Sequence, residues 1–336
     1  MRRRLGDTSN VLPLFPQEQI QEQRHVQLIK EHTGLDSCDP LQSISYVPSA
    51  FVQAVLPYRD LPNTSVWAKG NDKVSMVVTA GSRVVNQETI NERGRVVTTS
   101  VVVPRGLPFG SLPRLILSWV ATEAITTRQR KIQLGRNMSD FMTRIGCQHL
   151  SGGDKGTLTR TFQQAVRLFS CTISLVRNNT SFDDHSLSGM PGQPIVDRCD
   201  ILTDGARPSD MGGSYLVLSD WFFNEVTQHG VPCDLDAIIQ LRNSALALDI
   251  YAWLTWRMSL IQRPTVVRWE MLHDQFGAQC ANIRKFRQTF RAALTNVLEV
   301  YPGAEVDDKS NPAGLTLFPS STHVPRLVQR QASLLG

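Results

Sequence analysis

The chain has 336 residues, of which 41% are hydrophobic and 19% charged, and these values are near the average for globular proteins. No apolar run approaches the ~18 residues that a membrane span needs, and no signal peptide is apparent, so we expect a cytoplasmic protein. The net charge of +5 and the isoelectric point near 9.0 are compatible with nucleic-acid binding but do not require it.

The cysteines and histidines give no sign of a metal site, because they are scattered along the chain. The six cysteines include no C-x-x-C pair, and the seven histidines form no H-x-H or H-E-x-x-H motif. The chain also lacks the G-x-x-x-x-G-K-[ST] loop of nucleotide-hydrolysing enzymes and any paired-carboxylate motif typical of a nuclease. We therefore expect neither a metal, nor a cofactor, nor an enzymatic activity.

The N-terminal segment, residues 1–66, is polar and interrupted by prolines, and we interpret it as an arm that is partly disordered in isolation. From Trp67 the pattern changes to β-branched runs, which predict strands at residues 74–78 and 95–103 with polar sequence between them. Later strand-like runs lie at residues 171–176 and 214–218.

One pattern of elements occurs twice. Each copy has a long helix with a tryptophan, a short strand, a helix that ends at a glycine, and a long amphipathic helix. The first copy comprises helix 112–127, strand 131–134, a helix ending at Gly146, and helix 157–169. The second comprises helix 245–260, strand 265–267, helix 268–276 before Gly277, and helix 282–298. We expect the tryptophans in and near these helices to be core residues, namely Trp119, Trp253, Trp256 and Trp269.

Helix, strand, helix, turn and helix in this order are typical of a winged helix, whose last helix reads a DNA groove. The sequence therefore predicts an α+β fold with two tandem winged-helix domains and small antiparallel sheets. The first domain is placed at residues 67–230 and the second at residues 231–336, divided at Gly230-Val231-Pro232. The second wing, between Val300 and Phe318, carries more acidic than basic residues, so we expect DNA contacts there to come from the helix.

The last helix of the second copy separates apolar from basic residues. At about 100° per residue, one face gathers Phe286, Phe290, Ala293, Leu294 and Val297. The opposite face is basic, which suits DNA because phosphates attract cations and guanine edges accept hydrogen bonds from Arg or Lys. The residues predicted to read bases are Asn282, Arg284, Lys285 and Arg287, and the residue predicted to contact phosphate is Arg291.

The corresponding helix of the first copy shows a weaker form of the same separation. Its apolar face is centred on Phe162, and its opposite face includes Gln163 and Gln164. The residues predicted to contact DNA here are Lys155, Thr157, Thr159, Arg160 and Arg167. For both helices the alternative is a charged face that is simply solvated.

Several segments, in this order, resemble the RepA-type replication initiators of bacterial plasmids. They are Phe109–Arg114, Leu134–Gly146, Gly152-Gly153 with Thr157–Phe169, and Val231–Met258. The resemblance covers roughly residues 70–320. It implies an initiator that binds repeated double-stranded DNA sites, or iterons, at a plasmid origin through tandem winged-helix domains.

The resemblance also implies a division of roles and a set of partners. In such proteins the C-terminal unit supplies much of the base reading, and the N-terminal unit adds DNA contacts and dimerisation. Initiators of this type open the adjacent AT-rich duplex and recruit the host helicase and initiator. Many also repress their own gene as dimers, which contributes to plasmid copy control.

A short apolar segment in the arm, Leu12-Pro13-Leu14-Phe15, resembles the L-x-L-F motif by which replication proteins bind the bacterial sliding clamp. The family form usually begins with Gln, where this chain has Val11. Clamp binding through Leu12, Leu14 and Phe15 is one interpretation, and docking of the segment onto the first domain is the other.

Two other functions fit the same pattern. A winged-helix repressor would act at an operator without a role in initiation, and an assembly protein would use its basic faces to bind acidic partners. Tandem unequal units favour direct repeats over a palindrome, so the architecture favours an initiator.

Overall fold

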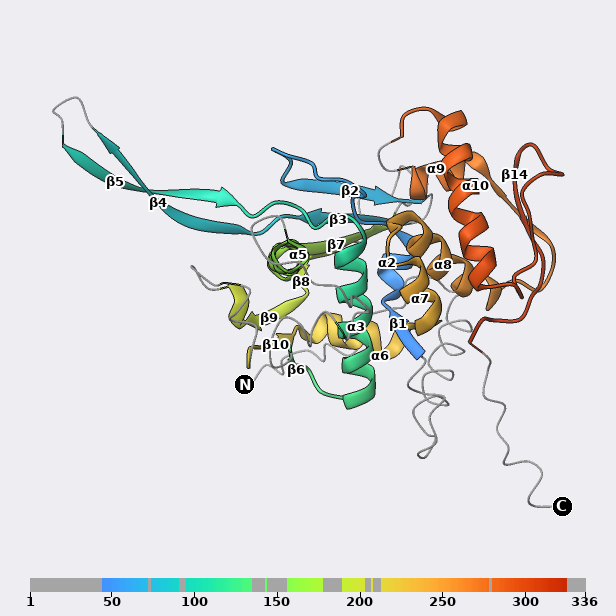
Figure 1. The fold of residues 1–336 in the computed structure, drawn as a ribbon, viewed down its shortest axis with the longest axis horizontal. Helices are drawn as coiled ribbons and strands as arrows, with labels where there is room; N and C mark the ends of the chain where they lie inside the picture. The colour runs from blue at the N-terminus through green and yellow to red at the C-terminus, as the bar shows by residue number, and fades with distance from the viewer. Residues whose placement is uncertain are drawn as a thin grey trace, which may run out of the picture.

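The computed structural model describes residues 44–71, 74–90, 95–134, 143, 156–177, 189–202, 207, 213–277 and 280–324. Within these residues the fold is α+β, as predicted, and its sheets are small and antiparallel (Figure 1). The elements up to residue 230 are β1 (Ile44–Val47), α2 (Ser49–Gln53), β2 (Val66–Gly70), β3 (Val74–Thr79), β4 (Ser82–Ile90), β5 (Val96–Pro104), α3 (Ser111–Thr127), β6 (Lys131–Gln133), α5 (Thr157–Ser170), β7 (Thr172–Arg177), β8 (Gly189–Pro194), β9 (Val196–Cys199), η2 (Asp200–Leu202), β10 (Tyr215–Leu218) and α6 (Asp220–His229).

The remaining elements lie after residue 230, in the range of the second predicted unit. They are β11 (Val231–Asp234), α7 (Leu235–Leu241), α8 (Ala245–Met258), β12 (Thr265–Arg268), α9 (Trp269–Phe276), α10 (Ile283–Val300), β13 (Val306–Asp307) and β14 (Gly314–Leu317). Several helices begin where a side chain caps the first turn. Ser219, Asp234 and Ser244 accept hydrogen bonds from backbone N–H groups three residues later, which sets the starts of α6, α7 and α8.

The two copies of the predicted pattern share a sheet order. In the first copy the order is β6-β10-β9, and in the second it is β12-β14-β13. In each sheet the strand that follows the first helix forms one edge, and the last strand lies in the centre, antiparallel to both neighbours. The helix predicted to end at Gly146 lies outside the described residues, apart from Thr143, which is helical.

The first unit contains a further sheet and a long hairpin. Strands β2, β3, β7 and β8 form a four-stranded sheet in that order, and β4 pairs only with β5. The strands predicted at residues 74–78 and 95–103 are confirmed as β3 and β5. The polar sequence between them also contains a strand that was not predicted, β4 at residues 82–90, which pairs with β5 along its whole length.

Residues 44–56 correct the predicted N-terminal arm. Strand β1 pairs antiparallel with β11, which begins the second predicted unit, and Ala50, Phe51 and Val52 of α2 are buried. The Gln275 amide of α9 donates to the Val52 carbonyl at 2.8 Å, and Glu225 of α6 accepts from the Ser49 hydroxyl at 2.8 Å. This segment therefore lies in the core and contacts both units, which its prolines obscured in the sequence.

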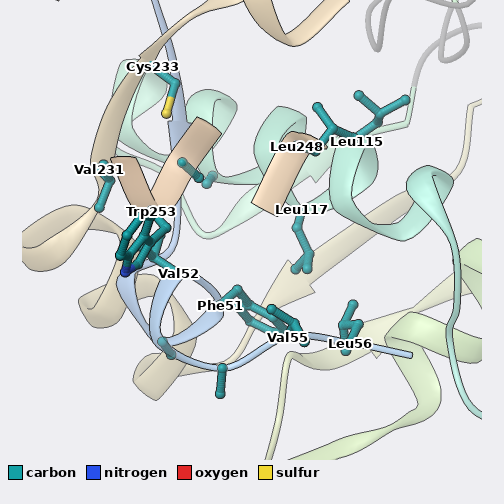
Figure 2. Packing of buried hydrophobic residues seen from close by; sticks show 14 of the residues in the cluster. Phe51, Val52, Val55, Leu56, Leu115, Leu117, Val231, Cys233, Leu248 and Trp253 are labelled. Atoms are coloured by element: carbon teal, nitrogen blue, oxygen red, sulfur yellow. The ribbon is translucent and has the colours of Figure 1, made fainter. Parts of the chain in front are cut away.

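The centre of the molecule is formed by α3 and α8. A helix that is apolar on all sides must be buried on all sides, and α8 is buried continuously over residues 247–255 and α3 over residues 115–121. Figure 2 shows side chains of both helices gathered around α2, with Leu117, Leu248 and Phe51 among those labelled. Each such buried large side chain stabilises the fold by about 1.5–3 kcal/mol.

The four tryptophans expected in the core differ slightly in burial. Trp119, Trp253 and Trp269 are buried, which confirms the prediction, and Trp256 is partly buried at the surface of the core. None of them lies on an exposed face of the described structure.

Candidate nucleic-acid interface

Helix α10 has the two faces that its sequence predicts. Phe286, Phe290, Ala293, Leu294 and Val297 are buried, and Phe290 packs edge-on against Trp269 with ring centroids 5.9 Å apart. The helix begins at its cap Asn282, whose Oδ1 accepts from the N–H groups of Arg284 at 2.9 Å and Lys285 at 3.3 Å. The Asn282 oxygen is thus committed to the helix, while its amide nitrogen remains available as a donor.

Two cations at the start of α10 are exposed. Arg284 and Lys285 lie in its first turn and form no ion pair with the described residues. The first turn also contains no acidic residue. The positive end of the helix dipole adds to the side-chain charge there, so this end of α10 favours an anion.

The other two predicted arginines are held by the protein. The Arg287 guanidinium lies 3.5 Å from Glu270 and 5.5 Å from the centre of the Trp269 ring. The Arg291 guanidinium pairs with the Asp308 carboxylate at 3.1 Å and lies 5.1 Å from the same ring. Their side chains are still 34% and 43% exposed, so the guanidinium groups can contact a ligand. Glu270, Asp308 and Trp269 set the orientation in which they do so.

The acids of the predicted second wing have structural roles. Asp307 accepts from the backbone N–H groups of Lys309 at 2.8 Å and Ser310 at 3.0 Å, which closes the turn after β13 and lowers the pKa of this carboxyl. Asp308 holds Arg291. Lys309 is the one basic residue between Val300 and Phe318, so the predicted wing offers little positive charge to DNA.

The polar face of α5 is only partly exposed. Arg160 is exposed, Thr157 opens the helix, and Lys155 lies outside the described residues. Gln164, predicted on the polar face, is instead buried at 6% exposure, because its Oε1 accepts from the Phe109 N–H at 2.9 Å.

Arg167, also predicted to contact DNA, has partners within the protein. Its guanidinium pairs with Asp60 at 2.8 Å, donates to the Leu107 carbonyl at 3.1 Å and lies 5.2 Å from the Phe109 ring. Gly106 packs against it with φ of +85°, and a Cβ at this glycine would lie 3.1 Å from the Arg167 Cζ. Arg167 therefore fixes the loop before α3. Its side chain is 23% exposed, so little of it is accessible to DNA.

Sequence reasoning missed a cationic and aromatic cluster on the first sheet. The Lys131 ammonium of β6 lies 4.0 Å from the centre of the Tyr215 ring of β10, and the Arg198 guanidinium of β9 lies 5.4 Å from it. Arg198 is 70% exposed. Lys131 stands in a run of basic residues without acids, but only the sheet order brings Arg198 beside it.

The predicted clamp motif, the metal ligands and the cysteines complete the comparison with the sequence. The segment Leu12-Pro13-Leu14-Phe15 lies outside the described residues. Among the residues that the structure describes, no group of three or more His, Cys, Asp or Glu could hold a metal. Within the same ranges, no helix has the length and apolar character to cross a membrane. Burial raises the pKa of the Cys171 thiol to about 12, so this cysteine is an unreactive core residue.

Comparison with known proteins identifies part of the chain. Residues 107–271 match the model of a family described as plasmid encoded RepA protein, a range that runs from before α3 into α9 and excludes α10. A crystal structure of domain 2 and domain 3 of RctB is 13% identical, covers 80% of this chain and 96% of its own, and has a TM-score of 0.47. A likeness at that level supports no inference about function. No curated protein matches the chain.

Proposed function

Over residues 107–271 the chain belongs to the family of plasmid encoded RepA proteins, which are replication initiators, and we propose that it binds repeated double-stranded DNA sites at an origin. The observation that carries this proposal is the first turn of α10, where Arg284 and Lys285 are exposed without ion pairs to the described residues. The N-terminal turns of a recognition helix are the part that reaches base edges in the major groove.

The repeated topology supports two winged-helix units. In the second copy α10 directly precedes β13 and β14, and in the first copy α5 precedes β9 and β10, with β7 and β8 of the other sheet between them. In both copies the strand after the first helix lies at an edge of the three-stranded sheet. In this interpretation α10 reads bases through Asn282, Arg284, Lys285 and Arg287. Arg291 approaches phosphate from its fixed position beside Trp269.

The first unit contributes a smaller share of the DNA contacts in this proposal. On α5 the contacts come from Thr157 and Arg160, with Lys155 immediately before the helix. Lys131 and Arg198 add phosphate contacts from the sheet, since both cations flank Tyr215 at its surface. Arg167 contributes least, because its guanidinium is engaged by Asp60 and Leu107.

The wider role in initiation extends the same proposal. The protein would promote opening of the origin and recruit the host helicase and initiator without catalysing a reaction or using a cofactor. The proposal also includes self-association and a cytoplasmic location. It includes binding of the sliding clamp through Leu12, Leu14 and Phe15. A repressor acting at a single operator is the alternative.

The test of base reading is a mobility-shift titration on the DNA that flanks the gene. Arg284→Ala and Lys285→Ala should each weaken specific binding by about 1–3 kcal/mol, because each removes one base contact. Arg83→Ala is the matched control, since it removes an exposed charge from the distant β4 and should leave affinity nearly unchanged. Equal losses in all three variants would mean that only net charge matters.

Footprinting of the wild-type protein on the same DNA separates the two functions. An array of protected direct repeats supports the initiator, and a single protected palindrome supports the repressor. Because phosphate contacts release counterions, affinity should also fall steeply with salt.

A further inference from the structure

The hairpin of β4 and β5 extends away from the rest of the molecule (Figure 1). Its strands pair over their whole length, from Ser82 with Pro104 to Ile90 with Val96. No other strand among the described residues pairs with either of them. A two-stranded hairpin by itself is marginally stable in water, so this length of isolated ribbon needs a further source of stability.

The hairpin holds most of the exposed apolar surface. Of the eight large hydrophobic side chains that are exposed in the described part of the chain, six belong to it. These are Val84, Ile90, Val96, Val97, Val101 and Val102. Apolar side chains gathered in this way on a soluble protein mark a surface that another molecule covers.

The two outer edges of the hairpin differ in charge. Strand β4 carries Arg83 and Glu88, whereas β5 has no charged residue and a proline only at its last position, Pro104. Charged side chains and prolines are the usual means by which an edge strand resists pairing with another strand. The edge of β5 is therefore the one open to an added strand.

The sequence of β5 is symmetric in chemical character around Thr99. Residues 96–102 read Val-Val-Thr-Thr-Ser-Val-Val, so two valines and one hydroxyl residue flank Thr99 on each side. In an antiparallel pair of two such strands centred on Thr99, Val96 faces Val102 and Val97 faces Val101. Thr98 faces Ser100, and valine pairs and hydroxyl pairs of this kind stabilise antiparallel sheets.

We propose that β5 pairs antiparallel with β5 of a second copy of this chain, with Thr99 facing Thr99 across a two-fold axis. The result is a four-stranded sheet in the order β4-β5-β5-β4. The inference rests on the self-association included in the proposed function and gives it a surface and a register. It is tested without DNA, so its failure is distinguishable from a failure of DNA binding. A ribbon for DNA would need cations along its edge, and β5 has none.

The proposed β5–β5 interface is small. Seven paired residues span about 23 Å, and a contact of this kind lies below the area of most stable dimers. We therefore expect a dimer that forms at high concentration and dissociates on dilution. Its register should nevertheless be strict, because a slip by one residue places hydroxyls against valines and exchanges the faces.

Disulfide trapping tests the register. Thr99→Cys, in a chain whose Cys38, Cys147 and Cys280 are replaced by serine, should oxidise to a covalent dimer in the majority of molecules. Gln87→Cys is the matched control, because Gln87 is the cross-strand partner of Thr99 on the far strand and should stay monomeric. Failure of Thr99→Cys to cross-link, or equal cross-linking of both variants, would overturn the proposal.

Charge exchange tests the pairing without cysteines. A chain with Val97→Lys and Val101→Lys faces itself with like charges, as does a chain with Val97→Glu and Val101→Glu. Each alone should sediment as a monomer at concentrations where the wild type dimerises, and an equal mixture should regain the dimer. Both valines are exposed in the single chain, so folding is retained. A mixture that stays monomeric would count against this register, and so would lysine variants that still dimerise.

Discussion

The basic side chains of α10 differ in how firmly the protein holds them. Arg287 and Arg291 lie beside Trp269 and are paired with Glu270 and Asp308, so they reach a ligand already oriented. Lys285 has no such partner among the described residues and retains its rotamer freedom. An arginine fixed in this way loses less entropy on binding, so Arg287 and Arg291 suit contacts at a fixed position, and Lys285 suits a contact that it reaches by changing rotamer.

A second residue with a defined environment is His323, near the end of the described chain. Its Nδ1 lies 2.7 Å from the Tyr251 hydroxyl, and its ring stacks on Tyr301 with centroids 4.6 Å apart. Burial lowers the pKa of His323 from its ordinary value of 6.5, although the charge of Asp234 partly offsets this. The folded protein therefore favours the neutral imidazole.

This environment predicts a pH dependence of stability. A lowered pKa means that the contribution of His323 is complete above pH 6.5 and is lost as the pH falls toward the folded value. We expect the difference in free energy of unfolding between wild type and His323→Gln to shrink from pH 7.5 to 5.5 in urea titrations. A difference that stays constant over this range would contradict the assignment.

At the scale of elements, one residue both starts α10 and stands within the proposed interface. Asn282 caps the helix, and its position at the N-terminal end brings it next to any anion that the helix binds. A change at this position therefore affects the helix and the ligand separately, according to the side chain introduced.

Two substitutions at Asn282 separate these effects. Asn282→Ala removes the cap and should destabilise the protein by about 1 kcal/mol in urea denaturation. Asn282→Asp keeps the cap, since aspartate is an equally good N-cap residue, and should leave stability nearly unchanged. The same aspartate repels phosphate, so its mobility shift should weaken despite the intact fold. Wild-type affinity in Asn282→Asp would remove Asn282 from the interface.

At the scale of the whole molecule, a buried ion pair joins the two units. Arg114 of α3 and Asp249 of α8 form two hydrogen bonds of 2.7 Å and are 9% and 8% exposed. The guanidinium also donates to the carbonyls of Leu56 and Gly110. Burial alone would lower the pKa of Arg114, but the Asp249 carboxylate reverses this and raises it. The pair thus fixes how α3 and α8 cross, and with them the two helices proposed to contact DNA.

Removing one partner of this ion pair should lower the free energy of unfolding strongly. Asp249→Ala leaves the Arg114 charge buried and uncompensated, which should lower the free energy of unfolding by about 3–5 kcal/mol. Arg114→Met with Asp249→Leu removes both charges and should restore much of that stability. Urea titrations of the two variants decide the matter, and a double variant no more stable than Asp249→Ala would argue against charge as the cause.

The sequence by itself determined the features that depend on local order. Helix α10 was predicted with its apolar face and its exposed cations, because helical periodicity involves residues only a few positions apart. Its cap at Asn282 was not predicted, since this residue was assigned only to base reading. The double occurrence of helix, strand and helices was predicted for the same reason. The family resemblance to RepA-type initiators was confirmed over residues 107–271.

Only the tertiary structure decided the features that depend on partners distant in the chain. Gln164 and Arg167 were assigned to a DNA face, but Phe109 and Asp60 bind them from segments 55 or more residues away. Likewise β1 entered the core through its pairing with β11, and Arg198 came beside Tyr215 through the order of a sheet. Periodicity shows which face of an element is polar, and the neighbours of that face are set by packing of the whole chain.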